Sequence, residues 1–250
     1  MATDRKEKKL SRVAEPKPFS TEELAKHIDP VLMKDLGRIQ IDTHKRKHLT
    51  VVFWDISGFS TLCNDLNDYP EAIVYFLNDY FTRAIKIIEK NEGVLDKFIG
   101  DGIFAYFGYT SRNGNGDPYN AIRAALEFKS KFPTFRSQFN KYCTKYYGKE
   151  PSDYNLKCGM HNGPAFLHYF SASTRNSIIL MGSTVNLASR LQSIAKDDEI
   201  IVSKRLRNMV QEKFKFLRIA TNDRIEEESS KGKIKSFEEE DIVYSLAGKA

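Results

Sequence analysis

One stretch of the chain, residues 50–108, limits the possible folds more than any other. It begins with β-branched and aromatic residues, Thr50 to Trp54, and then reaches Asp55. Apolar side chains at helical spacing follow from Pro70 to Asn91. The stretch closes with two short hydrophobic runs around Gly100-Asp101-Gly102, which is a typical hairpin sequence. If these strands pair side by side, Asp55 and Asp101 emerge at one rim of one sheet.

Two carboxylates at one rim are suited to divalent cations. Asp55 sits where the first strand is expected to end, and Asp101 sits in the hairpin turn. Mg²⁺ and Mn²⁺ take oxygen ligands and leave room for phosphate oxygens. The pair therefore predicts a site that holds either metal against a triphosphate. The following turn, Ile56 to Ser60, offers backbone amides that can face a phosphate.

Length and composition narrow the class of protein. The 250 residues fit one domain with tails, or at most two small domains, and 41% hydrophobic residues with 17 Phe provide for a sizeable core. There is no apolar run of about 18 residues and no apolar stretch after the charged first ten residues, so we expect neither a membrane span nor a secretory signal. Three widely spaced cysteines form no disulfide or zinc pattern and favour a reduced, cytoplasmic setting.

The formal charge of +6 suits an anionic ligand and would also suit nucleic acid. Because the lysines are spread along the chain and no nucleic-acid-binding motif is present, we interpret most of this charge as solvated surface. We expect no nucleic acid partner. His161 and His168 have no acidic or Cys partner at metal-ligand spacing, and we interpret both as structural or solvated.

Periodicity and turn residues predict the remaining elements. Gly93 is expected to end the long helix, and Ser183 with Thr184 to cap another helix that runs to about Ala195. Asn186 and Arg190 are four residues apart and share a face of that helix, next to a glycine turn where phosphate sites form. The other expected elements are a loose tail (1–18), helices (21–28, 30–37, 119–139, 205–212), a polar link (142–153), a hairpin (156–161 and 165–170 around Asn162-Gly163-Pro164) and strands (178–181, 200–203, 214–219, 242–246).

Four motifs in the chain resemble the class III nucleotidyl cyclases, in the order and spacing of that family. The resemblance covers about residues 48–246, and four linked motifs are far more specific than any one of them. The matching segments are Phe53–Phe59, Lys97–Asp101 with Ala105–Gly108, Gly159–Ala165 and Gly182–Leu191.

The resemblance implies a ferredoxin-like α/β (α+β) domain, an antiparallel sheet flanked by helices, at 48–246, with residues 1–47 as an N-terminal tail and short helices. It also implies a head-to-tail homodimer with composite sites in the cleft. In such a site Asp55, Asp101 and the Ile56 carbonyl hold two Mn²⁺ or Mg²⁺ ions. Asn186 and Arg190 come from the partner chain, where Asn186 positions the ribose and Arg190 stabilises charge on the phosphoryl group.

The implied substrate is a nucleoside triphosphate, cyclised when its 3′-hydroxyl attacks the α-phosphorus and pyrophosphate leaves. Gly58 and Phe59 lie in the turn expected beside the phosphates. Lys235 has the spacing of the family's triphosphate-binding lysine, with Lys231 and Lys233 as alternatives.

The base is where this sequence departs from the family pattern. Adenylate cyclases pair a Lys with an Asp or Thr acceptor, and here Lys97 stands at the first position and Ile179 at the second. A lone donor suits a carbonyl, and because guanylate cyclases carry Glu in place of Lys97, uracil is favoured over guanine. Trp54, usually a small residue in this family, either narrows the cleft toward a smaller base or points into the core.

A chain with no sensor, receiver or membrane region also resembles the pyrimidine cyclases of bacterial Pycsar anti-phage systems. We therefore predict a cyclase that makes cyclic UMP. The alternatives are an adenylate cyclase, a cytidylate cyclase, a non-catalytic dimerisation or nucleotide-sensing module, and a distant nucleic-acid binder.

Overall fold

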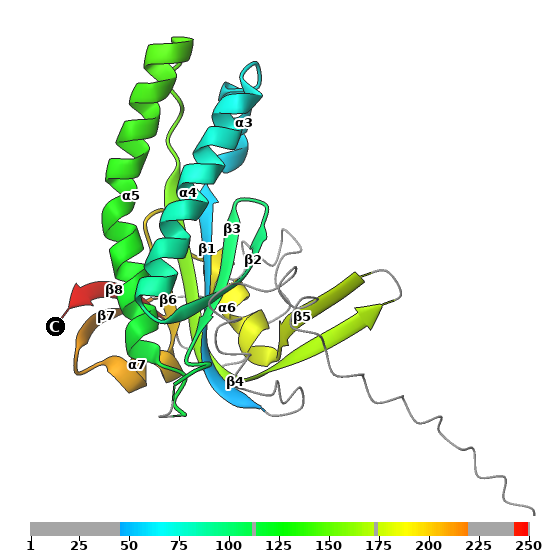
Figure 1. Cartoon of the computed structure of the whole chain (residues 1–250). Coiled ribbons are helices and arrows are strands. Elements are labelled where there is room, and N and C mark those ends of the chain that lie inside the picture. Colours follow the sequence, from blue (N-terminus) through cyan, green and yellow to red (C-terminus); the bar gives the residue numbers. More distant parts are fainter. Residues whose placement is uncertain (1–45, 112–113, 173–174, 220–242, 250) are drawn as a thin grey trace, which may run out of the picture.

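The computed structural model describes residues 46–111, 114–172, 175–219 and 243–249. The predicted tail, the helices at 21–28 and 30–37, and Lys235 with its two alternatives lie outside these residues. The described part forms an eight-stranded sheet flanked by helices, the α+β arrangement that the sequence predicts (Figure 1).

The strands are β1 (Lys47–Ser57), β2 (Gly93–Ile99), β3 (Gly102–Phe107), β4 (Asn155–Ala172), β5 (Arg175–Met181), β6 (Ile200–Ser203), β7 (Phe214–Arg218) and β8 (Val243–Lys249). The helices are α3 (Phe59–Asp65), α4 (Pro70–Lys90), α5 (Pro118–Tyr147), α6 (Ser183–Ser193) and α7 (Lys204–Val210). The strand order is β2-β3-β1-β4-β6-β8-β7, and β5 pairs with β4 outside this path. Described pairs are antiparallel except β4 with β6, which are parallel and joined through β5 and helix α6.

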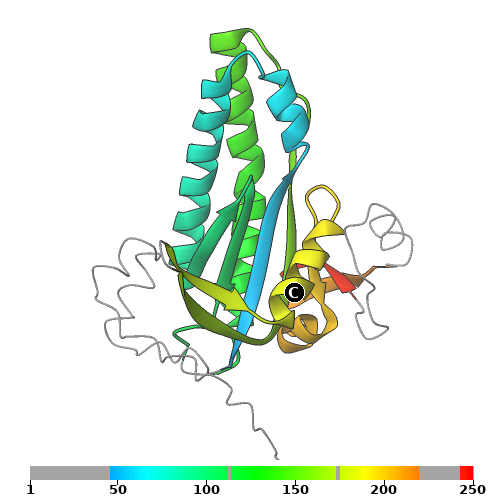
Figure 2. The same ribbon diagram turned by 90° about the vertical axis from the view of Figure 1, so that its right-hand side faces the viewer.

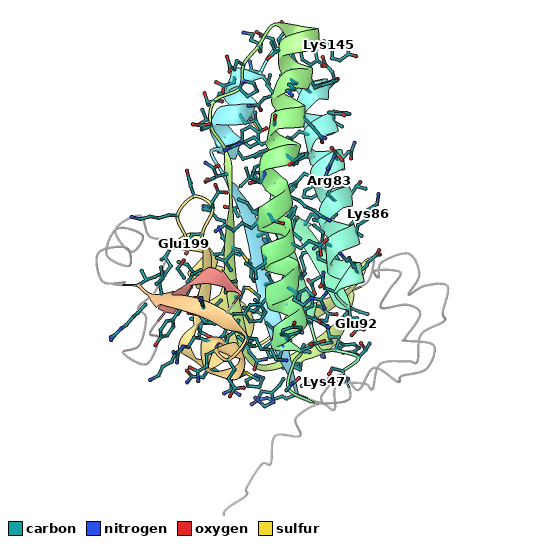
Figure 3. All side chains as sticks on the ribbon, turned by 90° about the vertical axis from the view of Figure 1, so that its left-hand side faces the viewer. Lys47, Arg83, Lys86, Glu92, Lys145 and Glu199 are labelled. Atoms are coloured by element: carbon teal, nitrogen blue, oxygen red, sulfur yellow. The ribbon has the colours of Figure 1, made fainter. Side chains whose placement is uncertain are left out.

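The two faces of the sheet have different covers. Helices α4 and α5 pack on one face, and α6 with the β4–β5 arm lies on the other (Figure 2). Side chains of β1 alternate between these faces, so Val52 and Trp54 join the core beneath the helices while Val51 and Phe53 pack on the opposite side. By the same alternation Asp55 belongs to the α6 face. On the outer side of the helical layer, charged side chains such as Lys86 of α4 point away from the sheet (Figure 3).

Helix α5 is longer than predicted. The sequence predicted a helix from 119 to 139 and a polar link from 142 to 153, but α5 runs from Pro118 to Tyr147. The prediction was wrong because the buried stripe of Phe128, Phe132, Phe135 and Phe139 continues to Cys143 at the same spacing. Pro118 lies in the first turn of this helix, where a missing N–H costs no hydrogen bond.

Strand β4 has no hairpin at Asn162-Gly163-Pro164. These residues stay within one strand, which pairs with β5 further along the chain. The side chain of Asn162 is buried and donates to Thr50 Oγ1 at 2.9 Å, and a Cβ on Gly163 would lie 2.6 Å from Thr184 Oγ1. Both residues therefore serve close packing between neighbouring elements, so the turn interpretation was wrong.

Two predicted helix caps are also corrected. Asn91 ends α4, whereas Gly93 begins β2, where a Cβ would lie 2.5 Å from the Phe107 ring. Gly182 is the N-cap of α6, and Thr184 instead donates its hydroxyl to the Pro164 carbonyl at 2.8 Å. In the described residues, no helix combines the length and the apolar character that crossing a membrane requires.

Candidate active site

The structure brings Asp55 and Asp101 together at one rim of the sheet. Trp54 of β1 pairs with Ile103 of β3, so Asp55 lies beside the hairpin turn, and a Cβ on Gly102 would lie 3.7 Å from Asp55 Oδ1. The Ile56 main-chain N–H donates to Asp101 Oδ2 at 3.1 Å. Strand β1 continues two residues past Asp55 to Ser57, which lets the backbone at Ile56 take part in this contact.

The rim concentrates negative charge. Burial, and then the neighbouring charge of Asp55, raise the pKa of Asp101 to about 6, although the N–H of Ile56 opposes the shift. Beneath it, burial and then both carboxylates raise the pKa of the Tyr80 hydroxyl, which has no hydrogen-bond partner among the described residues. Two acids held this close favour a bound cation, because like charges in a partly buried site repel.

Two donors already approach Asp55, and the sequence reasoning missed both. Lys157 Nζ lies 3.1 Å from Asp55 Oδ2, and Gln192 Nε2 donates to the same oxygen at 3.0 Å. Lys157 stands directly opposite Asp55 in the β1–β4 register, so knowledge of that register would have identified it. Gln192 comes from α6, and only the docking of that helix reveals it.

The oxygen donors of this rim fit a divalent cation. Two carboxylates and a main-chain oxygen are hard ligands, and Mg²⁺ is commonly bound by one or two carboxylates plus substrate phosphates. In the described ranges, no three His, Cys, Asp or Glu side chains gather into a larger metal cluster. The Lys157 ammonium and the neutral amide of Gln192 both approach Asp55 Oδ2, so this oxygen already pairs with one cationic group.

Asn186 and Arg190 lie on α6, and they do not face the carboxylates of their own chain. Gln192 of this helix reaches Asp55, and at about 100° per residue Arg190 projects about 160° away from Gln192 around the helix axis. Asn186 is exposed and Arg190 half-buried. Within the part of the chain that the structure describes, neither side chain has a hydrogen-bond or ion-pair partner.

The predicted base-binding residues lie on different strands that approach each other. Lys97 lies on β2 and Ile179 on β5, and they are brought near each other because the carboxylate of Asp96 accepts the main-chain N–H of Leu180. Trp54 does not line this region. It is 1% exposed and meets Phe128 edge-on in the core beneath α5, so its interpretation as a residue that narrows the cleft was wrong.

In the turn after β1, only main-chain groups are placed to contact a phosphate. Gly58 has φ +80, a value that favours glycine, and a Cβ there would lie 2.6 Å from the Asp153 carbonyl. The ring of Phe59 stacks on Phe76 with 6.1 Å between ring centroids. The ring is thus committed to the core, which leaves the backbone as the part of Phe59 that can meet a phosphate.

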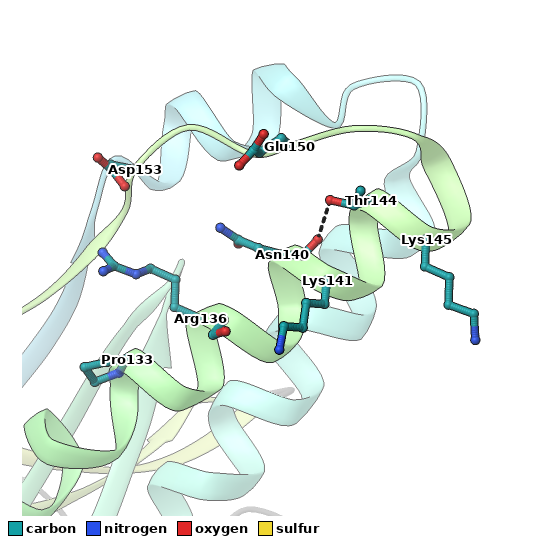
Figure 4. Close-up of a pocket in the computed structure, with 9 residues that line it drawn as sticks. Pro133, Arg136, Asn140, Lys141, Thr144, Lys145, Glu150 and Asp153 are labelled. Carbon is teal, nitrogen blue, oxygen red and sulfur yellow. Dashed lines mark hydrogen bonds between the residues drawn. The ribbon is translucent and has the colours of Figure 1, made fainter.

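A separate cavity of about 550 Å³ lies at the far end of α5 (Figure 4). Both signs of charge line it, with Arg136 and Lys141 from α5 and Glu150 and Asp153 from the segment that follows. Arg136 is already engaged, since it donates to the Tyr154 carbonyl at 3.1 Å. This cavity contains none of the predicted site residues.

Comparisons with known proteins agree with the motifs. Residues 41–240 match the family described as the adenylate and guanylate cyclase catalytic domain. An adenylate cyclase of Anabaena cylindrica is 27% identical over 171 residues, which are 68% of this chain and 32% of that protein. Guanylate cyclase 2D of Rattus norvegicus is 31% identical over 163 residues, which are 65% of this chain and 13% of that protein. The chain thus spans a third or less of these relatives.

Among solved structures, the adenylyl cyclase CyaB from P. aeruginosa has a TM-score of 0.68 and 28% identity, with 82% of this chain and 96% of that chain covered. The guanylyl cyclase Cya2 has a TM-score of 0.64 at 21% identity, with 82% and 94% covered, and this likeness concerns the fold alone.

Proposed function

The chain belongs to the family of adenylate and guanylate cyclase catalytic domains, and we propose that it converts a nucleoside triphosphate into a 3′,5′-cyclic monophosphate and pyrophosphate. The observation that carries this proposal is the placement of Asp55 and Asp101 on neighbouring segments at one rim of the sheet. In the reaction the 3′-oxygen forms a bond to the α-phosphorus and gives up its proton, while the bond from that phosphorus to the β-phosphate oxygen breaks. Such a reaction depends mainly on positioning and on stabilising charge.

Residues of one chain hold the reacting phosphate. Asp55, Asp101 and the Ile56 carbonyl would bind two Mg²⁺ or Mn²⁺ ions, which lower the pKa of the 3′-hydroxyl and bind the leaving phosphates. The N–H of Ile56 keeps the Asp101 carboxylate in place. Lys157 adds positive charge on the same rim, and this charge attracts the negatively charged triphosphate. A lysine of the 231–235 segment, Lys235 by the family spacing, would hold the terminal phosphates.

A second copy of the chain would complete the site. Because Arg190 and Asn186 project away from the carboxylates of their own chain, they are available to a partner. There Asn186 would position the ribose and Arg190 would stabilise the charge on the transferring phosphoryl group, for which a planar guanidinium with five N–H donors is suited. The proposed enzyme is therefore a homodimer with two composite sites.

Complementation between two inactive variants tests this arrangement. Asp101→Asn and Arg190→Ala should each lose about a hundredfold or more in rate. Mixed in equal amounts, they should recover about a quarter of wild-type activity, because half of the dimers are mixed and each mixed dimer has one intact site. A mixture that shows mixed dimers by mass spectrometry but no recovered activity would contradict the composite site.

We propose uridine as the base. Lys97 offers an ammonium to a base carbonyl, and Ile179 offers no side-chain acceptor for an exocyclic amine, which would leave adenine's or cytosine's amine unpaired at a cost of about 1–3 kcal/mol. A role in anti-phage signalling depends on this cyclic UMP product.

Adenine is the second candidate, because CyaB and the Anabaena relative are adenylate cyclases by name and a backbone carbonyl near Ile179 would also accept from an amine. Turnover of the four nucleoside triphosphates with Mn²⁺, followed by product separation, decides the base. Cyclic AMP as the sole product would end the uridine proposal, and nucleotide binding with no cyclic product from any triphosphate would favour a non-catalytic module.

A further inference from the structure

A β-bulge in β2 places a buried acid next to the predicted base-binding lysine. Leu95 pairs with Ala105 and Lys97 with Phe104, so Asp96 is the extra residue between two consecutive pairs of the β2–β3 ladder. A bulge interrupts the strict alternation of side chains and re-aims them, and bulges are frequent beside active sites. The bulge brings the carboxylate of Asp96 close to the ammonium of its own neighbour.

Asp96 is almost fully buried, whereas Lys97 is not. The Asp96 side chain is 4% exposed and that of Lys97 40%, and Lys97 Nζ lies 3.1 Å from Asp96 Oδ2. Burial raises the pKa of Asp96, while Lys97 and the main-chain N–H of Leu180 oppose the shift. A carboxylate is costly to bury unless it is paired, so this one needs the ammonium and the N–H that reach it.

Asp96 also links two parts of the site. The N–H that it accepts belongs to Leu180 of β5, the residue next to Ile179. The same carboxylate therefore fixes Lys97 of the hairpin relative to Ile179 of the arm. Without the Asp96 carboxylate, the position of the Lys97 ammonium relative to Ile179 would depend only on the sheet and on the flexible lysine side chain.

The geometry leaves donors of Lys97 unused. Asp96 Oδ2 is buried and, among the described residues, accepts no aligned hydrogen bond, although the ammonium is 3.1 Å away. The contact is thus mainly electrostatic. An ammonium has three N–H donors, and the Lys97 ammonium also lies over the face of the Phe104 ring, whose centroid is 6.0 Å from Nζ. Phe104 in turn stacks on Phe53 at 4.5 Å, which makes a rigid floor.

We propose that Asp96 is a positioning residue of the base subsite: it holds the Lys97 ammonium above the Phe104 ring and against β5, so that free N–H donors of Lys97 meet the base. Asp96 acts through Lys97 and does not touch the base, because its carboxylate is buried. A lysine side chain has about 2 kcal/mol of rotamer entropy, and the ion pair removes part of that freedom before the nucleotide arrives. The proposal rests on the cyclase function proposed above.

The test is a double-mutant cycle between Asp96 and Lys97. Asp96→Asn keeps an oxygen for the Leu180 N–H and removes only the charge that holds Lys97. We expect KM for the preferred nucleotide to rise about tenfold, with kcat changed by less than about threefold and the preference among the four bases reduced. In a Lys97→Gln background the same substitution should change KM by less than about twofold, because nothing remains to be positioned.

Glu127→Gln is the matched control. Glu127 pairs with Lys131 at 2.6 Å and with Lys90 at 2.9 Å on the helical face, so this variant also loses a partly buried acid from ion pairs, far from the base subsite. It should leave KM and base preference unchanged, and the melting temperature of Asp96→Asn should fall no further than that of this control. Asp96→Glu, which restores the charge, should recover part of the lost affinity.

Equal losses from Asp96→Asn in both backgrounds would overturn the positioning role and make Asp96 a structural link between β2 and β5. The same cycle measured by calorimetric binding of α,β-methylene nucleotides with Mn²⁺ does not depend on turnover. A wild-type chain that binds these analogues without turnover would refute the cyclase while leaving the Asp96 coupling measurable. A wild-type chain that neither turns over nor binds any nucleotide would overturn both proposals.

Discussion

His161 allows a direct test of how burial of a titratable side chain changes the stability of the fold with pH. It lies on β4 with Nδ1 2.7 Å from Ser203 Oγ, and that oxygen accepts the N–H of Leu206 at the start of α7. The serine hydroxyl is therefore free to donate to a neutral imidazole. Burial, and then the charge of Arg205, lower the pKa of His161 from 6.5 to about 4.

The sign of the effect follows from proton uptake. Between pH 6.5 and pH 4 the unfolded chain protonates this histidine and the folded chain does not, so acid favours unfolding in that window. Each pKa unit corresponds to about 1.4 kcal/mol, and a folded pKa of about 4 predicts a loss of about 2 kcal/mol between pH 7 and pH 5. Below about pH 4 both states are protonated and no further loss arises from this group.

Urea unfolding followed by tryptophan fluorescence measures this loss. Trp54 is the only tryptophan of the chain and is buried in the core, so its emission reports global unfolding. His161→Asn keeps an oxygen near the position of Nδ1 but cannot be protonated, so it should lose about 2 kcal/mol less than the wild type between pH 7 and pH 5. Because its pKa is raised in the folded chain, Asp101 makes acid stabilise the fold over the same pH range. This contribution cancels in the comparison because both proteins contain Asp101.

His48→Asn, at an exposed position, is the control and should behave like the wild type. If His161→Asn and the wild type lose stability equally on acidification, the buried neutral imidazole is refuted.

Three further predictions follow from close contacts. Asp101→Asn relieves repulsion from Asp55, so in metal-free buffer near pH 8 the melting temperature should rise by a few degrees. Mn²⁺ should raise the melting temperature of the wild type in calorimetry but not that of this variant. Gly159→Ala would put a Cβ 2.0 Å from the main-chain nitrogen of Gln192; since backbone cannot rotate away, it should cost about 3 kcal/mol or more in urea unfolding, and a loss under 1 kcal/mol would contradict the packing of α6. Trp54→Phe should lower the free energy of unfolding by about 1–3 kcal/mol but leave the base preference unchanged. A changed preference would indicate that Trp54 lines the substrate cleft.

The sequence predicted elements best where local chemistry decides them. The Gly-Asp-Gly hairpin is confirmed as the β2–β3 turn, and the long apolar stripe is confirmed as α4. Errors arose where a residue usually found in turns serves packing instead, as Gly163 does beneath Thr184 and Gly93 does beside Phe107. Sequence periodicity and composition do not indicate which neighbouring atoms approach a glycine. The role of these glycines can therefore be assigned only once the fold is known.

The same limit applies to the site. Asp55 and Asp101 were predictable as neighbours because a hairpin and an adjacent strand bring them together with few alternatives. The approach of Gln192 to Asp55 depends on how α6 docks, which no local pattern encodes. The bulge at Asp96 depends on one unpaired residue in a ladder, and a shift of one position in the register would send its side chain to the other face.

Helix α6 links the two composite sites of the proposed dimer. One side of it holds Asp55 of its own chain through Gln192, and the opposite side presents Arg190 outward. Gly159 lets the helix backbone touch β4, because any side chain there would meet Ala188 and Gln192 main-chain atoms within 2.5 Å. A rigidly seated helix cannot move its arginine without also moving the amide that steadies the carboxylate. Any shift of α6 therefore alters metal binding in one site and phosphoryl stabilisation in the other at the same time, so the two sites of the dimer should respond to such a shift together.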